Sequence, residues 1–201
     1  LVAGGSGLCL LAAPLATFAQ QRVAKVPRIG ILDGTTVDFA PYRTERLRAG
    51  LRELGYVEGE NLVIERRHAP EGQPDRLQEL AADLVRLKVD AIVASGSLTP
   101  HAAKSATTTV PVIFTNHGDP LGSGLVGSLA RPGGNITGLT DIAAVLAGKR
   151  LELLKETIPK LSRVAVLWNP KSPGAEQSWK ESQLAARELA LQLHSMEVSS
   201  A

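Results

Sequence analysis

Short apolar runs alternate along this chain with amphipathic segments, and this alternation limits the possible folds more than any other feature of the sequence. Runs typical of buried strands lie at 28–32, 61–67, 89–95, 110–114, 135–139 and 163–168. Between the runs, apolar residues recur every three or four positions, most clearly after Pro74, where one helix face holds Leu77, Leu80, Ala81, Leu84 and Val85. Strands that alternate with helices predict an α/β fold in which parallel sheets are flanked by helices.

Helices are predicted between the other strands as well. They cover 47–54, 98–107, 145–158 and 174–194, and Pro159 ends the third of them. The last helix is expected to carry its apolar side chains on one face, at Ala175, Trp179, Ala186, Ala190 and Leu193.

The pattern restarts after Asp141, which predicts two α/β units. A first lobe is expected over 27–140 and the start of a second over 141–201, with the chain crossing between them near 138–143. In the second lobe we expect one full strand, 163–168, and the first half of another at 196–200. One strand and two helices are too few to close a core, so this lobe is expected to be incomplete, with its strand unpaired.

Residues 1–19 form a segment of a different kind. They carry no charge, and they combine an apolar stretch at 8–16 with the small residues Thr17 and Ala19 at the −3 and −1 positions of a cleavage site. This pattern is typical of a secretory signal peptide, and the stretch is too short to span a bilayer comfortably. The one cysteine, Cys9, follows Leu8 rather than the small residue that a lipoprotein signal needs. We therefore expect a periplasmic product without cysteine and without stable membrane insertion.

Composition argues against several functional classes. The chain has 22 Lys and Arg against 20 Asp and Glu, a net charge of +2, and its basic residues form no run. Aromatic residues make up 3%, whereas a nucleic-acid surface usually presents a basic face with stacking rings. The four histidines, at 68, 101, 117 and 194, lack metal-ligand spacing. No nucleic-acid partner, metal or cofactor is expected.

Gly122, Gly124 and Gly127 have the spacing G-x-G-x-x-G, and Asp141 follows at a distance that suits a dinucleotide-binding fingerprint. The mechanism of that fingerprint requires a strand directly before the first glycine and a helix of several turns after it. Here the preceding strand is expected to end near Phe114, and Pro132 limits any helix to about one turn. A structural role is therefore favoured, with a short helix anchored by Leu125, Val126 and Leu129.

Catalytic motifs are equally weak. The sequence contains no G-x-x-x-x-G-K-[ST], G-x-S-x-G or H-E-x-x-H pattern. His117 and Asp119 could form part of a triad with Ser95 or Ser97, but a polar loop or surface role is the favoured interpretation of each histidine. We therefore do not expect an enzyme.

Long stretches of the chain resemble one family. They are "VPVIFTNHGDPLGSGLVGSLARPGGNITGLTD", "LRAGLRELGYVEGENLVIERR", "LAADLVRLKVDAIVASGS" and "LELLKETIPKLSRVAVLWNP". These stretches are similar to ABC transporter substrate-binding proteins of the tryptophan/tyrosine-importer type, and the similarity covers 28–201. The resemblance implies a two-lobed periplasmic-binding type I fold, a monomer, and a small-molecule ligand trapped between the lobes. It also implies that the ligand passes to an ABC permease with its ATPase, and that the second lobe is only begun here.

Ligands of open parallel sheets bind outside the carboxyl ends of the strands, which points to five loops. The candidate ligand-binding residues in them are Asp33, Thr35, Ser95, Ser97, Thr99, His117, Asp119, Asp141, Trp168 and Asn169. The hydroxyls of the 95–99 loop suit either a carboxylate or the capping of a helix. The three aspartates suit either an ammonium group or turn chemistry, and Trp168 suits either the core or the cleft.

Two other functions remain open alternatives. The same fold serves as the ligand-sensing domain of receptors and regulators, and a doubly wound α/β enzyme has similar alternation. A DNA-binding helix pair before residue 27 would favour a regulator, whereas a nucleophile and base in contact would favour an enzyme.

Cleavage of the leader is the first testable expectation. Export should remove residues 1–19, because the small side chains of Thr17 and Ala19 fit the cleavage site. Mass spectrometry of the protein as its source cell makes it should find Gln20 at the new N-terminus. A cytoplasmic product that keeps residues 1–19 would contradict the prediction.

Overall fold

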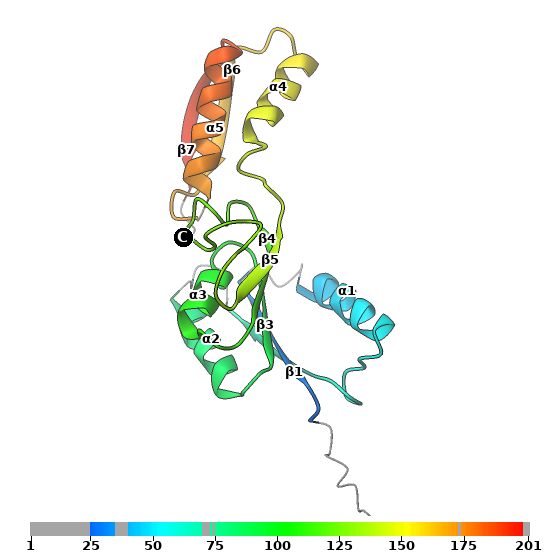
Figure 1. Cartoon of the computed structure of the whole chain (residues 1–201). Helices are drawn as coiled ribbons and strands as arrows, with labels where there is room; N and C mark the ends of the chain where they lie inside the picture. Colours follow the sequence, from blue (N-terminus) through cyan, green and yellow to red (C-terminus); the bar gives the residue numbers. More distant parts are fainter. Residues whose placement is uncertain (1–24, 35–39, 70–72, 74, 173, 199–201) are drawn as a thin grey trace, which may run out of the picture.

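The computed structural model describes residues 25–34, 40–69, 73, 75–172 and 174–198. The predicted leader, 1–19, and the candidate site residue Thr35 lie outside these ranges. The described chain forms two separate sheets, one above the other in Figure 1.

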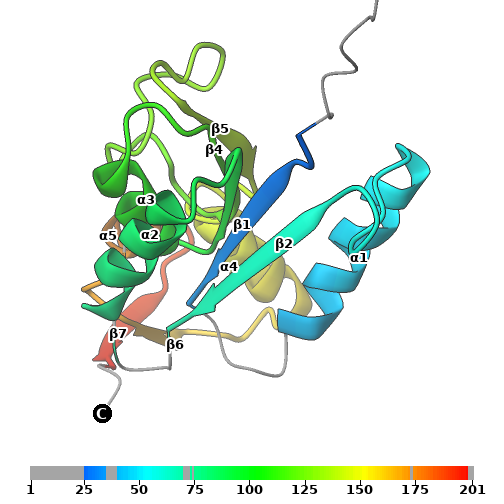
Figure 2. The ribbon, with the colours of Figure 1, turned by 90° about the horizontal axis from the view of Figure 1, so that it is seen from below.

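The first sheet has five parallel strands in the order β2-β1-β3-β4-β5. They are β1 (Arg28–Asp33), β2 (Val63–His68), β3 (Ala91–Ser95), β4 (Val112–His117) and β5 (Ile136–Thr140). Its helices are α1 (Ala40–Glu53), α2 (Arg76–Arg86) and α3 (Thr99–Ala106). Figures 1 and 2 show α1 on one face of this sheet and α2 with α3 on the other.

The core of this sheet lies under α2 and α3. Leu84 of α2 is fully buried against β1, where a Cβ at Gly30 would stand 3.0 Å from one of its methyl carbons. The predicted face of α2 is confirmed, since Leu77, Ala81 and Leu84 are buried and Leu80 and Val85 pack beside them. Glycine at position 30 therefore lets the helix approach the sheet closely.

Helix α1 is longer than predicted from Leu47, Leu51 and Leu54, whose spacing places them on one face of a helix. It begins at Ala40, and Leu54 lies just past its end with 75% of its surface exposed. The prediction that Leu54 belongs to the apolar face of this helix is therefore wrong. The helix ends at Glu53 and the chain turns at Gly55, whose φ is +84°, so Leu54 lies outside the last turn of α1.

Strand β4 continues three residues beyond Phe114, where the sequence predicts its end. The polar residues Thr115 to His117 extend it because His117 pairs with Thr140 of β5. An irregularity in the register between Phe114 and His117 coincides with a φ of +57° at Asn116. Such a bulge lets a strand continue after its apolar run has ended.

The glycine-rich connection from β4 to β5 forms turns rather than the predicted short helix, and no residue from 118 to 135 is helical. Leu125 and Val126 are buried as expected, but Leu129 is 54% exposed and anchors nothing. The Lys104 ammonium of α3 donates to the carbonyl oxygens of Gly124 and Leu125, at 3.0 and 2.8 Å. The Lys104 ammonium group thus supplies hydrogen bonds to carbonyl oxygens that backbone N–H groups would satisfy in a helix.

The second sheet has two parallel strands, β6 (Arg163–Trp168) and β7 (Gln192–Glu197), paired over six residues. The prediction that 163–168 lacks a partner strand is therefore wrong. Its helices, α4 (Ala147–Thr157) and α5 (Ala175–Glu188), pack together, and a Cβ at Gly148 would stand 3.2 Å from the Cβ of Ala185. Their small core holds Leu151, Ala186 and Leu191.

Helix α5 ends six residues before the predicted position, and β7 begins four residues earlier than the strand expected at Met196. Leu193, expected on α5, lies in β7. Ala190 has a φ of +52° and closes the helix with an N–H donated to the Arg187 carbonyl oxygen. No glycine or proline marks this helix end in the sequence, and an alanine seldom adopts a positive φ. The end of α5 was therefore not predictable from the sequence.

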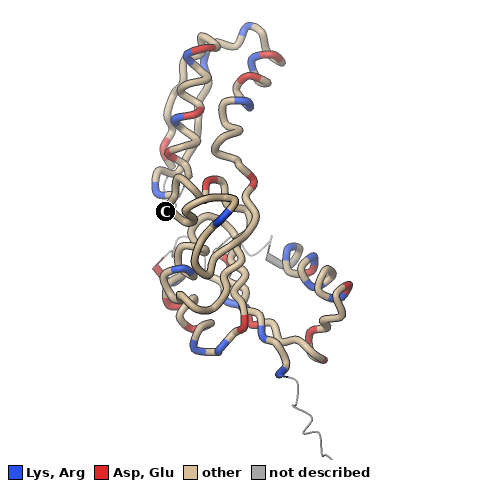
Figure 3. The backbone as a smooth tube through the Cα atoms, in the orientation of Figure 1, with Lys and Arg blue, Asp and Glu red and all other residues tan. Residues whose placement is uncertain are grey.

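Charges of both signs are interspersed over the two units (Figure 3), in keeping with the nearly balanced composition. Among the described residues, no helix combines the length and the apolar character that crossing a membrane requires.

Substitution of Gly138 tests the packing between β4 and β5. A Cβ at this position would overlap the carbonyl oxygen of Phe114 and stand 2.6 Å from its ring Cγ. We expect Gly138→Ala to lower the free energy of unfolding by about 1–3 kcal/mol, because backbone and ring must both shift. Urea unfolding measures the change.

Gly127→Ala is the matched control, since nothing lies within 4 Å of its Cβ position and its φ is not positive. Equal stability of the two variants would contradict the packing argument.

Candidate functional site

All strands of the first sheet end at one edge, because every neighbouring pair is parallel. Asp33, Ser95, His117 and Thr140 are the last residues of β1, β3, β4 and β5. The strands β6 and β7 run toward this edge from the other unit (Figure 1). The two carboxyl edges therefore face each other.

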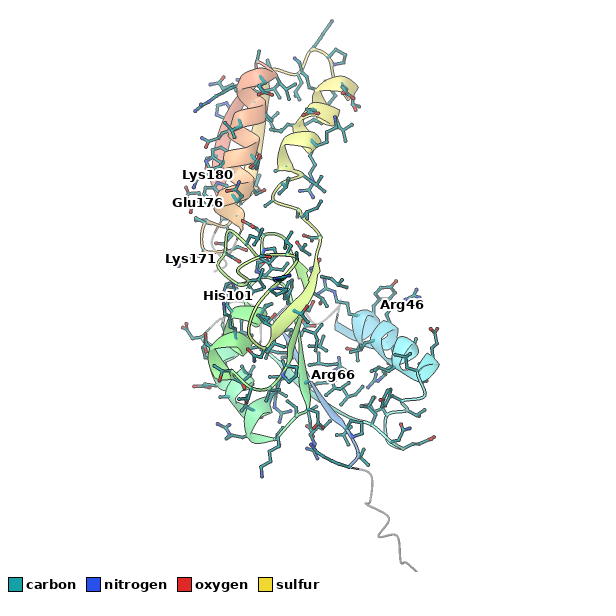
Figure 4. All side chains as sticks on the ribbon, viewed as in Figure 1. Arg46, Arg66, His101, Lys171, Glu176 and Lys180 are labelled. Carbon is teal, nitrogen blue, oxygen red and sulfur yellow. The ribbon has the colours of Figure 1, made fainter. Side chains whose placement is uncertain are left out.

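A cleft of about 390 Å³ lies between the two units. The first unit lines it with His101, Asp119, Gly122 and Ser123, and the second with Pro170, Lys171, Ser172, Gly174, Glu176, Gln177 and Lys180. Figure 4 shows His101 on the first unit, with Lys171, Glu176 and Lys180 on the second. Lys180 forms an ion pair with Glu176 at 2.7 Å.

Asp119 lies at the point where the two units meet. Its carboxylate Oδ1 accepts a hydrogen bond from the Gly122 backbone N–H at 2.8 Å, and a Cβ at Gly122 would overlap that carboxylate. Across the cleft, a Cβ at Gly174 would stand 3.1 Å from the Cβ of Asp119. The first glycine of the G-x-G-x-x-G spacing thus serves the turn at Asp119.

In the hydroxyl-rich 95–99 loop, some side chains are buried in hydrogen bonds within the protein and others are available to a ligand. The buried Thr99 hydroxyl donates to the Ser95 carbonyl oxygen at 2.6 Å. The N-cap of α3 is Leu98, with no side-chain capping bond. Ser97 is half-buried, and its hydroxyl makes no hydrogen bond within the described chain. Ser97 is therefore the side chain of this loop with its hydroxyl most available to a ligand.

The candidates after β5 and β6 are partly engaged in local contacts. Asp141 is exposed, and its carboxylate accepts a hydrogen bond from the Ala143 N–H at 3.1 Å. Trp168 stacks on Trp179 at 5.7 Å and donates from Nε1 to the Ser195 hydroxyl at 2.8 Å. The Asn169 side-chain oxygen accepts a hydrogen bond from the Lys171 N–H at 2.9 Å. Trp168 thus packs within the second unit.

Sequence reasoning missed several residues of the cleft and its edge. His101, Ser123, Lys171, Glu176 and Lys180 line the cleft from helices or turns that follow the predicted loops. A second omission is Arg43, whose Nη1 donates to the Ser95 hydroxyl oxygen at 2.9 Å. Its position in the first turn of the helix after β1 was the available signal, because such a turn also lies at the carboxyl edge.

Two histidines pack against each other beside the cleft. His117 is fully buried, and its ring centroid lies 5.8 Å from that of His101. Burial lowers the pKa of both rings, and for His101 the charge of Lys104 lowers it further. The pKa of His117 is lowered next by His101 and raised by Asp119 and Asp141. Both rings are therefore neutral at neutral pH.

The neutral His117 ring is poorly placed to act as a general base. Its Nδ1 accepts a hydrogen bond from the Asp119 N–H at 3.2 Å, which leaves the ring proton on Nε2. Nε2 lies 3.5 Å from the Ser123 hydroxyl oxygen, so it donates toward that group. Neither Ser95 nor Ser97 hydrogen bonds to this ring within the described chain. In this arrangement His117 does not activate a serine.

The described residues contain no group of three or more His, Cys, Asp or Glu side chains that could hold a metal ion.

Acid should destabilise the protein through the histidine pair. Unfolded histidines titrate near 6.5, whereas the folded pKa values are lower, so the unfolded state binds more protons between them. The stability contributed by the neutral rings is present above 6.5 and is lost as the pH falls through the folded values. We expect the melting temperature to fall as the pH is lowered from about 7.5 to about 5.5.

His101→Gln should reduce this fall, because it removes one of the two rings that must stay neutral. His194→Gln, at an exposed position of β7, is the matched control and should leave the fall unchanged. An identical fall in both variants would show that the pair is not responsible.

Known proteins share both the sequence pattern and this fold. A family model for ABC transporter substrate binding proteins matches residues 41–201. A tyrosine-binding protein from Clostridioides difficile (strain R20291) is 37% identical over 119 residues, which is 59% of this chain and 34% of that protein.

Solved structures agree with this result. A conserved domain protein from Vibrio cholerae superposes with a TM-score of 0.80 at 30% identity, over 87% of this chain and 58% of that one. An ABC domain from Streptococcus pneumonia in complex with L-Trp has a TM-score of 0.76 at 24% identity, over 86% and 57%. The chain thus spans about a third of the curated relative and somewhat over half of the solved structures.

These matches confirm the expected α/β fold class, that of the type I periplasmic-binding proteins. They also confirm the resemblance to the tryptophan/tyrosine-importer type. The chain belongs to the family of ABC transporter substrate binding proteins.

Proposed function

We propose that this chain is the ligand-capturing part of an extracytoplasmic solute-binding protein that serves an ABC importer. The observation that carries the proposal is that two separate parallel sheets turn their carboxyl edges toward one cleft. Loops at such edges are where open α/β sheets bind small molecules.

The ligand that suits this cleft is a small polar molecule, an amino acid or a similar compound. Its volume of about 390 Å³ falls in the range of small-molecule sites. Lys171 offers positive charge on one wall, where Lys180 is paired with Glu176, and Asp119 offers negative charge on the other. Relatives named for tyrosine and L-Trp support an amino acid, because a zwitterion uses charges of both signs.

The remaining parts of the proposal are supported by the family and by the sequence pattern. The partners are an ABC permease with its ATPase, the protein acts as a monomer, and it reaches the periplasm after removal of residues 1–19. The two lobes are assigned to 27–140 and 141–201. The ten candidate ligand-binding residues stay a prediction, with Asp119, which lines the cleft, as its central member. A ligand-sensing role would use the same cleft, and the cellular location of the protein separates the two functions.

An enzymatic role is less well supported. The relatives are substrate-binding proteins, and His117 uses its Nδ1 to accept a backbone hydrogen bond instead of activating a serine.

A panel of the common L-amino acids tests the proposal through the melting temperature. At about 100 times its dissociation constant, a ligand adds about 2.7 kcal/mol to the stability of the folded state. For a chain of this size, that energy raises the melting temperature by about 5–10 °C. At least one member of the panel should produce such a shift, confirmed by calorimetry.

Asp119→Asn keeps a turn-forming side chain but removes a charge from the wall of the cleft. It should weaken binding by about tenfold, because hydrogen bonds to charged groups contribute about 1.5–3 kcal/mol. Glu188→Gln, an exposed residue at the far end of α5, is the control. The proposal fails if no amino acid shifts the melting temperature, either of the 201-residue chain or of the protein purified from its native host.

A further inference from the structure

Arg43 differs from the other partly buried arginines of the described chain in how its charge is compensated. Four described arginines are partly buried: Arg28, Arg43, Arg48 and Arg67. Arg28 pairs with Glu65, Arg48 with Glu45 and Glu58, and Arg67 with Asp83 and Glu65. Within the described residues, no carboxylate lies within 4.0 Å of the Arg43 guanidinium. A partly buried cation without a counter-ion is costly unless something else compensates it.

The position of Arg43 places it at the carboxyl edge of the first sheet. It lies in the first turn of α1, and α1 begins at the end of the sheet toward which β1 and β2 point (Figure 2). Its Nη1 donates to the hydroxyl oxygen of Ser95, the buried last residue of β3. This hydrogen bond fixes one arm of the guanidinium fork over the edge.

Asp33 belongs to the same row of side chains. It pairs with Ser95 in register, and both residues are buried. Gly30 of the same strand and Gly34, the residue after it, face α2 and α3, as their Cβ positions beside Leu84 and Thr99 show. Because side chains alternate along a strand, Asp33 faces the opposite way, toward the side of α1. A carboxylate and a guanidinium thus lie at the same edge of the sheet.

We infer that Arg43 is the residue that recognises the carboxylate of the ligand, which places the ligand among carboxylate-bearing compounds. Ser95 holds one arm of the fork, and the remaining N–H groups bind a carboxylate in the paired geometry that arginine favours. Asp33, one strand away, suits the ammonium group of an amino acid. This inference rests on the proposed function, because it assumes that the site at this edge binds a small molecule.

The test compares acids with their amides, using L-tyrosine with L-tyrosinamide and L-tryptophan with L-tryptophanamide as probes. Arg43→Gln should weaken binding of the acid by about tenfold or more and leave the amide within about twofold, because only the acid has the charge that the fork binds. The affinity of Arg43→Lys for the acid should lie between those of the unmodified chain and Arg43→Gln, since lysine keeps the charge but lacks the fork. Calorimetry at constant ionic strength measures all affinities.

Arg46→Gln is the matched control. Arg46 lies one turn further along α1, is exposed, and has its guanidinium 5.1 Å from the ring centre of Tyr42. This variant should leave the affinity for acid and amide within about twofold of the original. Ser95→Ala removes the hydrogen bond that positions the fork and should weaken acid binding in the same direction, by less. If Arg43→Gln does not fold, Arg43→Lys and Ser95→Ala decide the question.

The outcomes separate this inference from the proposed function. An unchanged ratio of acid to amide affinity in Arg43→Gln, with the unmodified chain binding normally, overturns the role of Arg43 alone. Binding of an uncharged compound in preference to every acid also overturns it and leaves a binding function in place. If the unmodified chain binds no amino acid, amide or other small molecule, the proposed function and this inference fall together.

Discussion

The parallel pairing of neighbouring strands is the constraint from which the rest of this structure follows. A parallel pair cannot be joined by a hairpin, so each crossover must return to the far edge of the sheet before the next strand begins. Every strand of the first sheet therefore ends at one edge, and β6 and β7 end together at another. Five chain segments that are far apart in sequence therefore meet at the carboxyl edge of the first sheet.

The irregular backbone beyond β4 shows how such an edge is stabilised. The chain from Gly118 to Asn135 contains no helix, so its carbonyl oxygens need partners from elsewhere. Lys104 supplies two hydrogen bonds to it, and Asp119 accepts one from Gly122. At the other end of the connection, the Asn135 side chain donates to the Thr107 and Val110 carbonyl oxygens, at 3.1 and 2.6 Å. These contacts hold Asp119 where the loop of the second unit reaches it.

Much of this fold was predictable from the sequence because its main signals are local. The apolar run 28–32 and the face of Leu77, Ala81 and Leu84 need only a periodicity to be recognised, and both are confirmed. The extension of β4 to His117 depends on pairing with β5, and the early end of α5 depends on a positive φ at an alanine. Neither leaves a local trace in the sequence.

The site divides in the same way. The rule for parallel sheets predicts loops such as Ser95–Ser97 from strand ends alone. It does not predict Arg43, which reaches Ser95 across 52 positions, nor Lys171 and Lys180, which lie opposite Asp119 only through the arrangement of the two units. In the sequence, Arg43 is one more polar residue of a predicted helix. Its contact with Ser95 is recognised only when the position of α1 beside the carboxyl edge of the sheet is known.

The division of charged residues between the two units bears on how a ligand would act on this protein. Arg43 and Ser95 both belong to the first unit, so the ligand contacts proposed for them would not depend on the position of the second unit. Such contacts contribute to affinity but do not favour approach of the units, because a ligand shifts an equilibrium only by the difference in its affinity for the two states. Lys171 and Lys180 line the cleft from the second unit, and Gly174 of that unit lies close to Asp119 of the first, since a Cβ at Gly174 would stand 3.1 Å from the Cβ of Asp119. On the proposed function, contacts from the first unit would set the selectivity for a carboxylate, whereas only contacts from the second unit would couple binding to the distance between the units.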